Sequence, residues 1–242
     1  MFRSNRTGLV GNRWVLVGGI VYLLEWVAII WAGAIGVGAT VTRGTSAKAL
    51  LDTYAGHQDA VYAMAGWFAI ALLGRILVFV GLRSALADSG FGHPLMDFAV
   101  AVAAVSVTLE IASYALAGAA AGRADAGDET GMVLLDQSGA GLNLMIAGGL
   151  GVAITCAAYC MWRSGLFAPA LNVIGLVAGV AIAGAQLSVS PSMQPVFDVL
   201  FFFRLVFWVW MLWAGVVCWR ATPDRPERRS PEPGDTAGNL VG

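Results

Sequence analysis

Six long apolar segments divide this chain. Each holds about 20 or more residues with few charges, the length that a helix needs to cross the hydrocarbon core of a bilayer. Charged residues make up only 12% of the sequence, against about 25% in soluble domains, so a water-soluble fold could not cover its surface. The expected fold class is therefore all-α, a polytopic membrane protein with a bundle of six transmembrane helices. We expect the spans at residues 14–36, 60–82, 94–119, 138–162, 168–187 and 195–219.

Basic residues are distributed unevenly between the two sides of these spans. One side carries Arg3, Arg6, Arg13, Arg83, Arg163, Arg220, Arg225, Arg228 and Arg229. The other side carries only Arg43, Lys48 and Arg123. Because basic residues near span ends are retained in the cytoplasm, both termini are predicted to lie inside. We interpret the first span as a helix and not as a cleaved signal, whose apolar region is usually about 7 to 15 residues.

The chain is expected to hold one membrane domain and no soluble one. Residues 1–13 form a short cytoplasmic N-terminus, and residues 14–219 form the transmembrane domain. Residues 220–242 are rich in proline and charge and cannot bury enough apolar surface to fold, so they are predicted to be a disordered cytoplasmic tail. The outer loops at 37–59 and 122–137 are too short for a catalytic domain.

Four ionisable side chains lie deep inside the apolar segments: Glu25, Arg75, Glu110 and Arg204. A charge near the bilayer centre costs between about 2.5 and more than about 10 kcal/mol, so such residues normally pair or serve a function. At about 1.5 Å per residue from the predicted cytoplasmic boundaries, Glu110 and Arg204 lie near about 22 Å, and Glu25 and Arg75 near about 16 and 12 Å. Matching depths predict the pairs Glu110 with Arg204 and Glu25 with Arg75.

Two interpretations of this charge constellation remain open. In the first, the pairs are structural and fix the register of the helices, since losing one partner would strand a buried charge. In the second, the acids line a proton or substrate route, with Asp97 near its inner mouth and Asp198 and Gln186 near its outer mouth. The first three spans carry charges where the fourth and fifth have none, which argues against a symmetric transporter built from repeats.

Aromatic residues gather in the sixth span. Phe201, Phe207 and Trp208 are helical neighbours of Arg204 and are candidates to shield it or stack on it. They could form a pocket for an apolar ligand such as a lipid or quinone. Packing against other helices and against lipid is the alternative interpretation.

Several membrane chemistries are disfavoured by residue placement. His57 and His93 lie outside the spans and Lys48 lies in a loop, so haem ligation and a retinal-type Schiff base inside the bilayer are not expected. The sequence has no His-Glu-x-x-His and no Cys-x-x-Cys motif. We therefore predict no catalytic residue, no metal and no cofactor. The three cysteines are interpreted as small packing residues: Cys156, Cys160 and Cys218.

The fifth span carries small residues at every fourth position: Gly175, Gly179 and Ala183. This spacing lets membrane helices approach closely. It predicts tight packing of this helix.

Features of the second half resemble a known family. They are the short basic loop at 163–167, the helix from Pro169 with Leu171 and Gly175, and an aromatic last helix ending in Trp213, Ala214 and Gly215. The chain resembles the uncharacterised bacterial membrane proteins grouped as domain of unknown function 4386. The resemblance implies a multi-pass protein of the bacterial cytoplasmic (inner) membrane and no known activity, and it assigns no site residue.

Together these features predict a non-enzymatic membrane protein with a regulatory role or a lipid or apolar ligand. The alternative is a small proton-linked transporter that uses Glu25 and Glu110. An enzyme is the least supported class. The expected partners are membrane lipid and an apolar small molecule, not nucleic acid, and the sequence sets no oligomeric state.

Overall fold

The computed structural model describes residues 9–34 and 45–222, and within them it contains helices and no β-strand. The first half consists of α1 (Arg13–Leu23), α2 (Glu25–Ala34), α3 (Ala47–Tyr54), α4 (Gln58–Asp88) and α5 (Pro94–Asp125). The second half consists of α6 (Glu129–Leu144), α7 (Ile146–Ser164), α8 (Pro169–Ala185), α9 (Gln194–Phe201) and α10 (Arg204–Arg220), with 3₁₀ turns η1 (Gln186–Ser188) and η2 (Pro191–Met193) between α8 and α9.

Six helical stretches are long and apolar enough to cross a membrane, which confirms the predicted fold class. They are Arg13–Ala34, Gln58–Asp88, Pro94–Asp125, Glu129–Ser164, Pro169–Ser188 and Pro191–Arg220. Several are longer than predicted because helix continues past the apolar segment into polar residues. Most of the predicted tail at 220–242 (residues 223–242), most of the N-terminus and part of the first outer loop lie outside the described residues.

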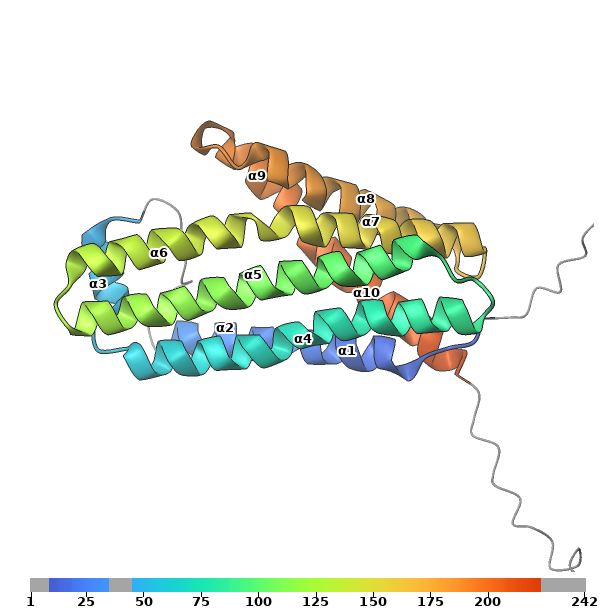
Figure 1. The fold of residues 1–242 in the computed structure, drawn as a ribbon, viewed down its shortest axis with the longest axis horizontal. Helices are drawn as coiled ribbons and strands as arrows, with labels where there is room; N and C mark the ends of the chain where they lie inside the picture. The colour runs from blue at the N-terminus through green and yellow to red at the C-terminus, as the bar shows by residue number, and fades with distance from the viewer. Residues whose placement is uncertain (1–8, 35–44, 223–242) are drawn as a thin grey trace, which may run out of the picture.

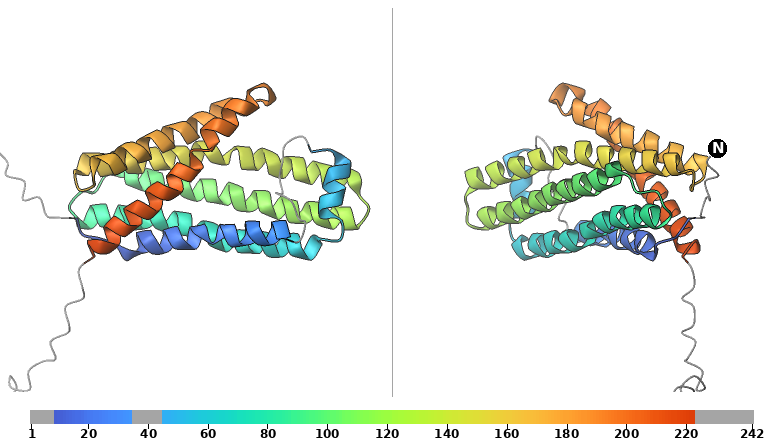
Figure 2. Two further views of the ribbon diagram at one scale, coloured as in Figure 1. Left: turned by 180° about the vertical axis from the view of Figure 1, so that it is seen from behind. Right: turned by 45° about the vertical axis from the view of Figure 1, so that its right-hand side comes forward.

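The spans form an elongated bundle (Figure 1). α4, α5 and the α6–α7 span lie side by side, and α1 and α2 follow α4. α10 crosses the bundle diagonally and packs on α1 and α8 (Figure 2). The hairpin of α8 and α9 diverges from α6, so α9 packs mainly on α8.

The beginning of α1 and the end of α10 lie at one end of the bundle. Gly11 N–H donates a hydrogen bond of 3.2 Å to the Ala221 carbonyl, and Val10 N–H donates one of 2.7 Å to Ser89 Oγ after α4. We call this the basic end because it carries Arg13, Arg83, Arg163 and Arg220. Gly165, in the left-handed conformation at φ 65°, ends α7 there and permits the short turn into α8.

Close helix contacts depend on glycine. A Cβ atom on Gly74 of α4 would lie 2.5 Å from the Gly18 carbonyl oxygen and from Tyr22 N of α1. A Cβ on Gly179 would lie 2.6 Å from Thr155 N of α7. Tight packing of α8, predicted from its small residues, is confirmed.

Three of the six spans are interrupted near their middle. The interruptions lie at Leu24, at Met145 and at residues 202–203. At each, an N–H donates to the carbonyl three residues earlier, which tightens the turn. Trp67 Nε1 donates a hydrogen bond of 2.6 Å to the Leu24 carbonyl, which the interruption leaves accessible. Two of the four intramembrane charges, Glu25 and Arg204, are the first residues after such an interruption.

A short helix that we did not predict, α3, runs across the bundle at the end opposite the basic end (Figure 2). Its Ser46 cap accepts a hydrogen bond from Ala49 N–H. Tyr54 Oη donates a hydrogen bond of 2.7 Å to Oδ1 of the buried Asp136 on α6. This bond fixes α3 against the bundle.

Candidate functional site

The intramembrane charges converge around Arg75 of α4. Its side chain is 1% exposed, and its Nη2 lies 2.6 Å from Glu110 Oε2 of α5. The same nitrogen donates a hydrogen bond of 2.9 Å to Tyr22 Oη of α1, and the guanidinium carbon lies 4.6 Å from the centre of the Tyr22 ring. One arginine therefore links three helices.

The predicted pairs, Glu110 with Arg204 and Glu25 with Arg75, are wrong, since Arg75 pairs with Glu110. The error comes from a helix boundary. α4 ends at Asp88 and not at residue 82, so Arg75 lies about 9 Å deeper than the sequence suggested. At that depth it is level with Glu110 across the α4–α5 hairpin.

Glu25 is buried beside this pair but not joined to it. Its side chain is 4% exposed, and no described cation lies within 4.0 Å of its carboxylate. It interacts electrostatically with Glu110, Arg75 and Arg204. Glu25 is also the first residue of α2, where the positive end of the helix dipole favours a carboxylate.

Arg204 contacts aromatic rings and no carboxylate among the described residues. Its guanidinium carbon lies 4.8 Å from the ring centre of Phe201 and 5.7 Å from that of Trp208. The residue is half-buried at the start of α10. The faces of these rings attract the guanidinium charge electrostatically.

The three aromatic residues proposed for a ligand pocket have different positions. Phe201 lines a cavity of about 250 Å³ together with Arg204. Phe207 is fully buried and packs on Tyr22. Trp208 is also buried, with its ring edge-on to Tyr22 and to Trp26 at 6.1 and 5.1 Å. Phe207 and Trp208 thus belong to the packed core between α1 and α10.

The charge centre contains donors that no described group satisfies. Nε and Nη1 of Arg75 and Nε1 of Trp208 are buried and lack an acceptor among the described residues. An unsatisfied buried donor is costly. These donors are suited to oxygen acceptors such as water or an anion.

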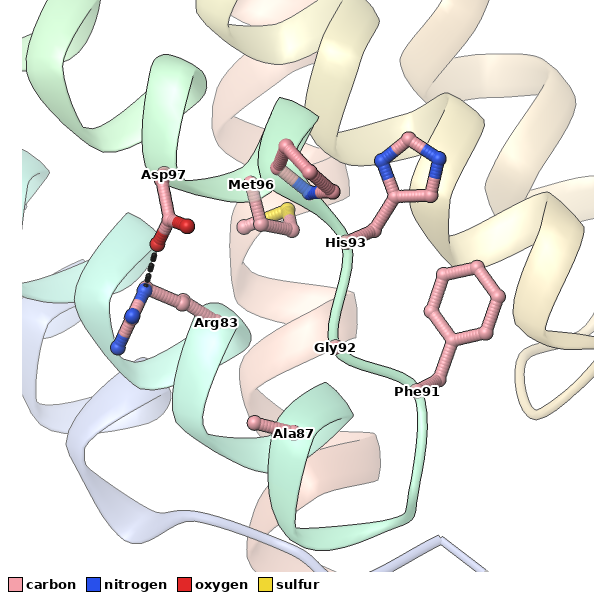
Figure 3. Close-up of a pocket in the computed structure, with 8 residues that line it drawn as sticks. Arg83, Ala87, Phe91, Gly92, His93, Met96 and Asp97 are labelled. Carbon is pink, nitrogen blue, oxygen red and sulfur yellow. Dashed lines mark hydrogen bonds and ion pairs between the residues drawn. The ribbon is translucent and has the colours of Figure 1, made fainter.

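The polar residues proposed as route entrances lie apart from this centre. Asp97 forms an exposed ion pair with Arg83 at the basic end. Figure 3 shows this pair on one side of the α4–α5 loop, whereas Phe91 and His93 extend to the other side.

The two residues proposed for the outer mouth form hydrogen bonds of their own. Gln186 Oε1 accepts a hydrogen bond of 3.0 Å from Gly148 N–H, close to the interruption in the fourth span. Asp198 accepts one of 2.7 Å from Gln194 Nε2 on α9.

The sequence contained no local signal for the interruptions, and the role of Tyr22 was missed. Tyr22 lies one helical turn before Glu25, a spacing that could have suggested contact with the charge centre. Among the described residues, no group of three or more His, Cys, Asp or Glu side chains is arranged to hold a metal ion.

The fold and the buried charge centre define a multi-pass helical membrane protein. Comparison of the chain with protein-family models, curated proteins and solved structures finds no match. The resemblance to the family of domain of unknown function 4386 stays a prediction.

Proposed function

We propose that this protein is a small proton-linked membrane transporter in which Glu25 binds and releases the proton. The observation that carries the proposal is the position of Glu25, which is buried at the interruption of the first span without an ion-pair partner among the described residues. An unpaired carboxylate is costly in an apolar medium, so its neutral form competes with its charged form. Carboxyl groups at such positions are typical of proton relays in pumps and transporters.

Glu110 has a different role in this proposal. Its carboxylate accepts the bond from Arg75 Nη2, and the pair is buried on both sides. Breaking a buried pair strands the remaining charge, so Glu110 holds Arg75 in place while Glu25 exchanges the proton. The candidate transporter thus depends on one titrating acid and not on two.

The interrupted spans support the same function. Transporters often bind ions and substrates where helices are discontinuous near the middle of the membrane, with interruptions at corresponding positions of two halves. Here the first and fourth spans, which open the two halves of three spans each, are both interrupted. The two halves differ in chemistry, because the middle of the fourth span and the fifth span carry no charge that corresponds to Glu25 or Arg75.

Infrared difference spectroscopy of the purified protein between about pH 5 and 9 tests the proton site. We expect a protonated-carboxyl band that titrates in this range and disappears in Glu25→Gln. Asp136→Asn is the matched control, because Asp136 is also buried but accepts a hydrogen bond from Tyr54. A spectrum with no band assignable to Glu25 overturns the proposal.

Transport itself is tested in proteoliposomes with an internal pH-sensitive dye. A panel of organic anions, amines and neutral solutes is added outside, and a solute-dependent pH change is expected in the natural protein. Glu25→Gln should abolish that change while the protein keeps its melting behaviour. A change of equal size in Glu25→Gln contradicts the assignment of the proton to this residue.

A second candidate function is the binding of a lipid or another apolar ligand, which the cavity beside Arg204 favours. For either function we infer a place in the bacterial cytoplasmic membrane with both termini inside. The support is the arginine excess at the basic end and the family resemblance.

A further inference from the structure

The cavity beside Arg204 combines two opposite charges with apolar walls. Its volume is about 250 Å³, and Asp198, Phe201, Phe202, Arg204 and Leu205 line it. No ion pair joins Asp198 and Arg204. The cavity therefore presents an acid and a base that do not neutralise each other directly.

Arg204 is a candidate to bind an anionic ligand, because it is half-buried and has no counter-charge among the described residues. Its guanidinium group is half-buried and contacts the Phe201 and Trp208 rings, with no described carboxylate within 4.0 Å. Arginine binds phosphate oxygens through paired N–H groups. Asp198 is exposed and holds only the Gln194 amide among the described side chains, so it has free lone pairs for a cation.

The two charges lie at different depths. From Arg220, at the basic end, α10 extends 16 residues back to Arg204, about 24 Å along its own diagonal axis. Asp198 lies six residues farther along the chain, on α9. Figure 2 shows α9 continuing the diagonal course of α10 in that direction. Asp198 thus lies nearer the opposite surface than Arg204, which follows the interruption near the middle of the span.

An apolar stripe continues from the cavity along α10. Phe202, Leu205 and Val209 recur at helical spacing, and their side chains are 65%, 38% and 61% exposed. Trp213 and Val216 extend the same stripe toward the basic end. The order along the helix is acid, base, apolar stripe.

A zwitterionic phospholipid has the complementary order of amine, phosphate and acyl chain. We propose that this cavity binds a phospholipid with an ethanolamine headgroup, from the leaflet opposite the basic end. Its phosphate contacts Arg204, its ammonium group contacts Asp198, and one acyl chain lies along Phe202, Leu205 and Val209. This site is separate from the Glu25 proton site, so either inference can fail alone.

Lipid retention tests the proposal. The full chain is reconstituted with equal amounts of phosphatidylethanolamine and phosphatidylglycerol, purified, and weighed with its bound lipids by native mass spectrometry. We expect the natural protein to retain the ethanolamine lipid preferentially, by about tenfold. Arg204→Gln should weaken retention of both lipids about tenfold, because both carry the phosphate. Asp198→Asn should remove the preference and leave retention of the glycerol lipid unchanged.

The exposed ion pair of Arg123 with Asp128 provides matched controls. It lies in the α5–α6 turn at the same end of the bundle, so Arg123→Gln and Asp128→Asn change the same charges without touching the cavity. Both controls, and Glu25→Gln, should keep the preference for the ethanolamine lipid. Asp198 is exposed, so its variant remains informative even if Arg204→Gln does not fold.

Two results overturn the proposal. If the natural protein and Asp198→Asn retain the two lipids in the same ratio, only an ordinary lipid annulus surrounds this face. If Arg204→Gln loses both lipids but the natural protein shows no preference between them, the site binds phosphate and does not recognise the ethanolamine amine.

Discussion

Arg75 Nη2 lies between Glu110 Oε2 at 2.6 Å and Tyr22 Oη at 2.9 Å, so one nitrogen joins α4 to α5 and to α1. The contact is fully enclosed, with both charged side chains almost inaccessible. Two of the four intramembrane charges therefore form a buried ion pair, whereas Glu25 and Arg204 form no ion pair with a described residue.

Glu110→Gln should destabilise the protein strongly, because it leaves the Arg75 guanidinium buried without a counter-charge. The expected loss is about 3 to 5 kcal/mol of unfolding free energy. Adding Arg75→Leu should recover much of this loss. Adding Arg204→Leu should instead give a loss equal to the sum of the losses in the two single variants. Unfolding of the purified protein in mixed micelles measures these three variants together with the single variants Arg75→Leu and Arg204→Leu. Coupling of Glu110 to Arg204, and not to Arg75, would contradict the geometry.

Tyr22→Phe should cost less, because it removes the hydroxyl acceptor and keeps the ring under the Arg75 guanidinium. We expect a loss of about 1 to 3 kcal/mol. Tyr62→Phe on α4 is the matched control, since that side chain is exposed, and it should leave stability unchanged. The two variants are compared by thermal melting. Equal melting temperatures would show that the Tyr22 hydroxyl bond contributes nothing.

Sequence reasoning found the spans because the bilayer fixes their length and composition, two quantities that a sequence displays directly. It also identified the glycine-lined contact of α8, since close approach demands small residues at a fixed spacing. It failed on the charge pairs because helix ends in polar sequence are poorly marked. The six additional helical residues, 83–88, shifted the apparent depth of Arg75.

The interruptions could not be predicted, because no glycine or proline stands at residues 24, 145, 202 or 203. The Leu24 carbonyl accepts one hydrogen bond from Val27 N–H and a second from Trp67 Nε1, 43 residues away. Likewise, the carbonyl of Ile146 accepts a hydrogen bond from Ser106 Oγ at 3.3 Å. The position of Glu25 at an interruption, on which the proposed function depends, therefore required the structure.

Tyr54→Phe should loosen α3 from the bundle, because it removes the hydrogen bond to the buried Asp136 carboxylate. Hydrogen–deuterium exchange of the α3 amides should become faster, while exchange in α5 and α7 stays the same. Thr53→Val is a matched control on the same helix. Its hydroxyl bonds only to the Ala49 carbonyl on an exposed face, so α3 should keep its protection. Unchanged exchange in Tyr54→Phe would mean that apolar packing alone holds α3.

Topology can be tested by thiol labelling in a background without the three natural cysteines. Thr130→Cys lies in the first turn of α6, opposite the basic end, and should react with an impermeant reagent in intact cells. Gly92→Cys lies in the α4–α5 loop at the basic end, where a Cβ meets no atom within 4 Å, and should react only after lysis. Labelling of Gly92→Cys in intact cells, with Thr130→Cys protected, would invert the predicted orientation.

Gly74→Ala should be disproportionately destabilising for the addition of one methyl group. Its Cβ would lie 2.5 Å from backbone atoms of α1, so α1 and α4 would have to separate, and Tyr22 would move away from Arg75. Overpacking of this kind costs about 1 to 3 kcal/mol. Gly66→Ala on the same helix is the matched control, because no atom lies within 4 Å of its Cβ. The gain in helix propensity there should leave stability unchanged or raise it by about 1 kcal/mol. The pair is compared by unfolding in mixed micelles, and equal effects at the two positions would contradict the close contact between α1 and α4.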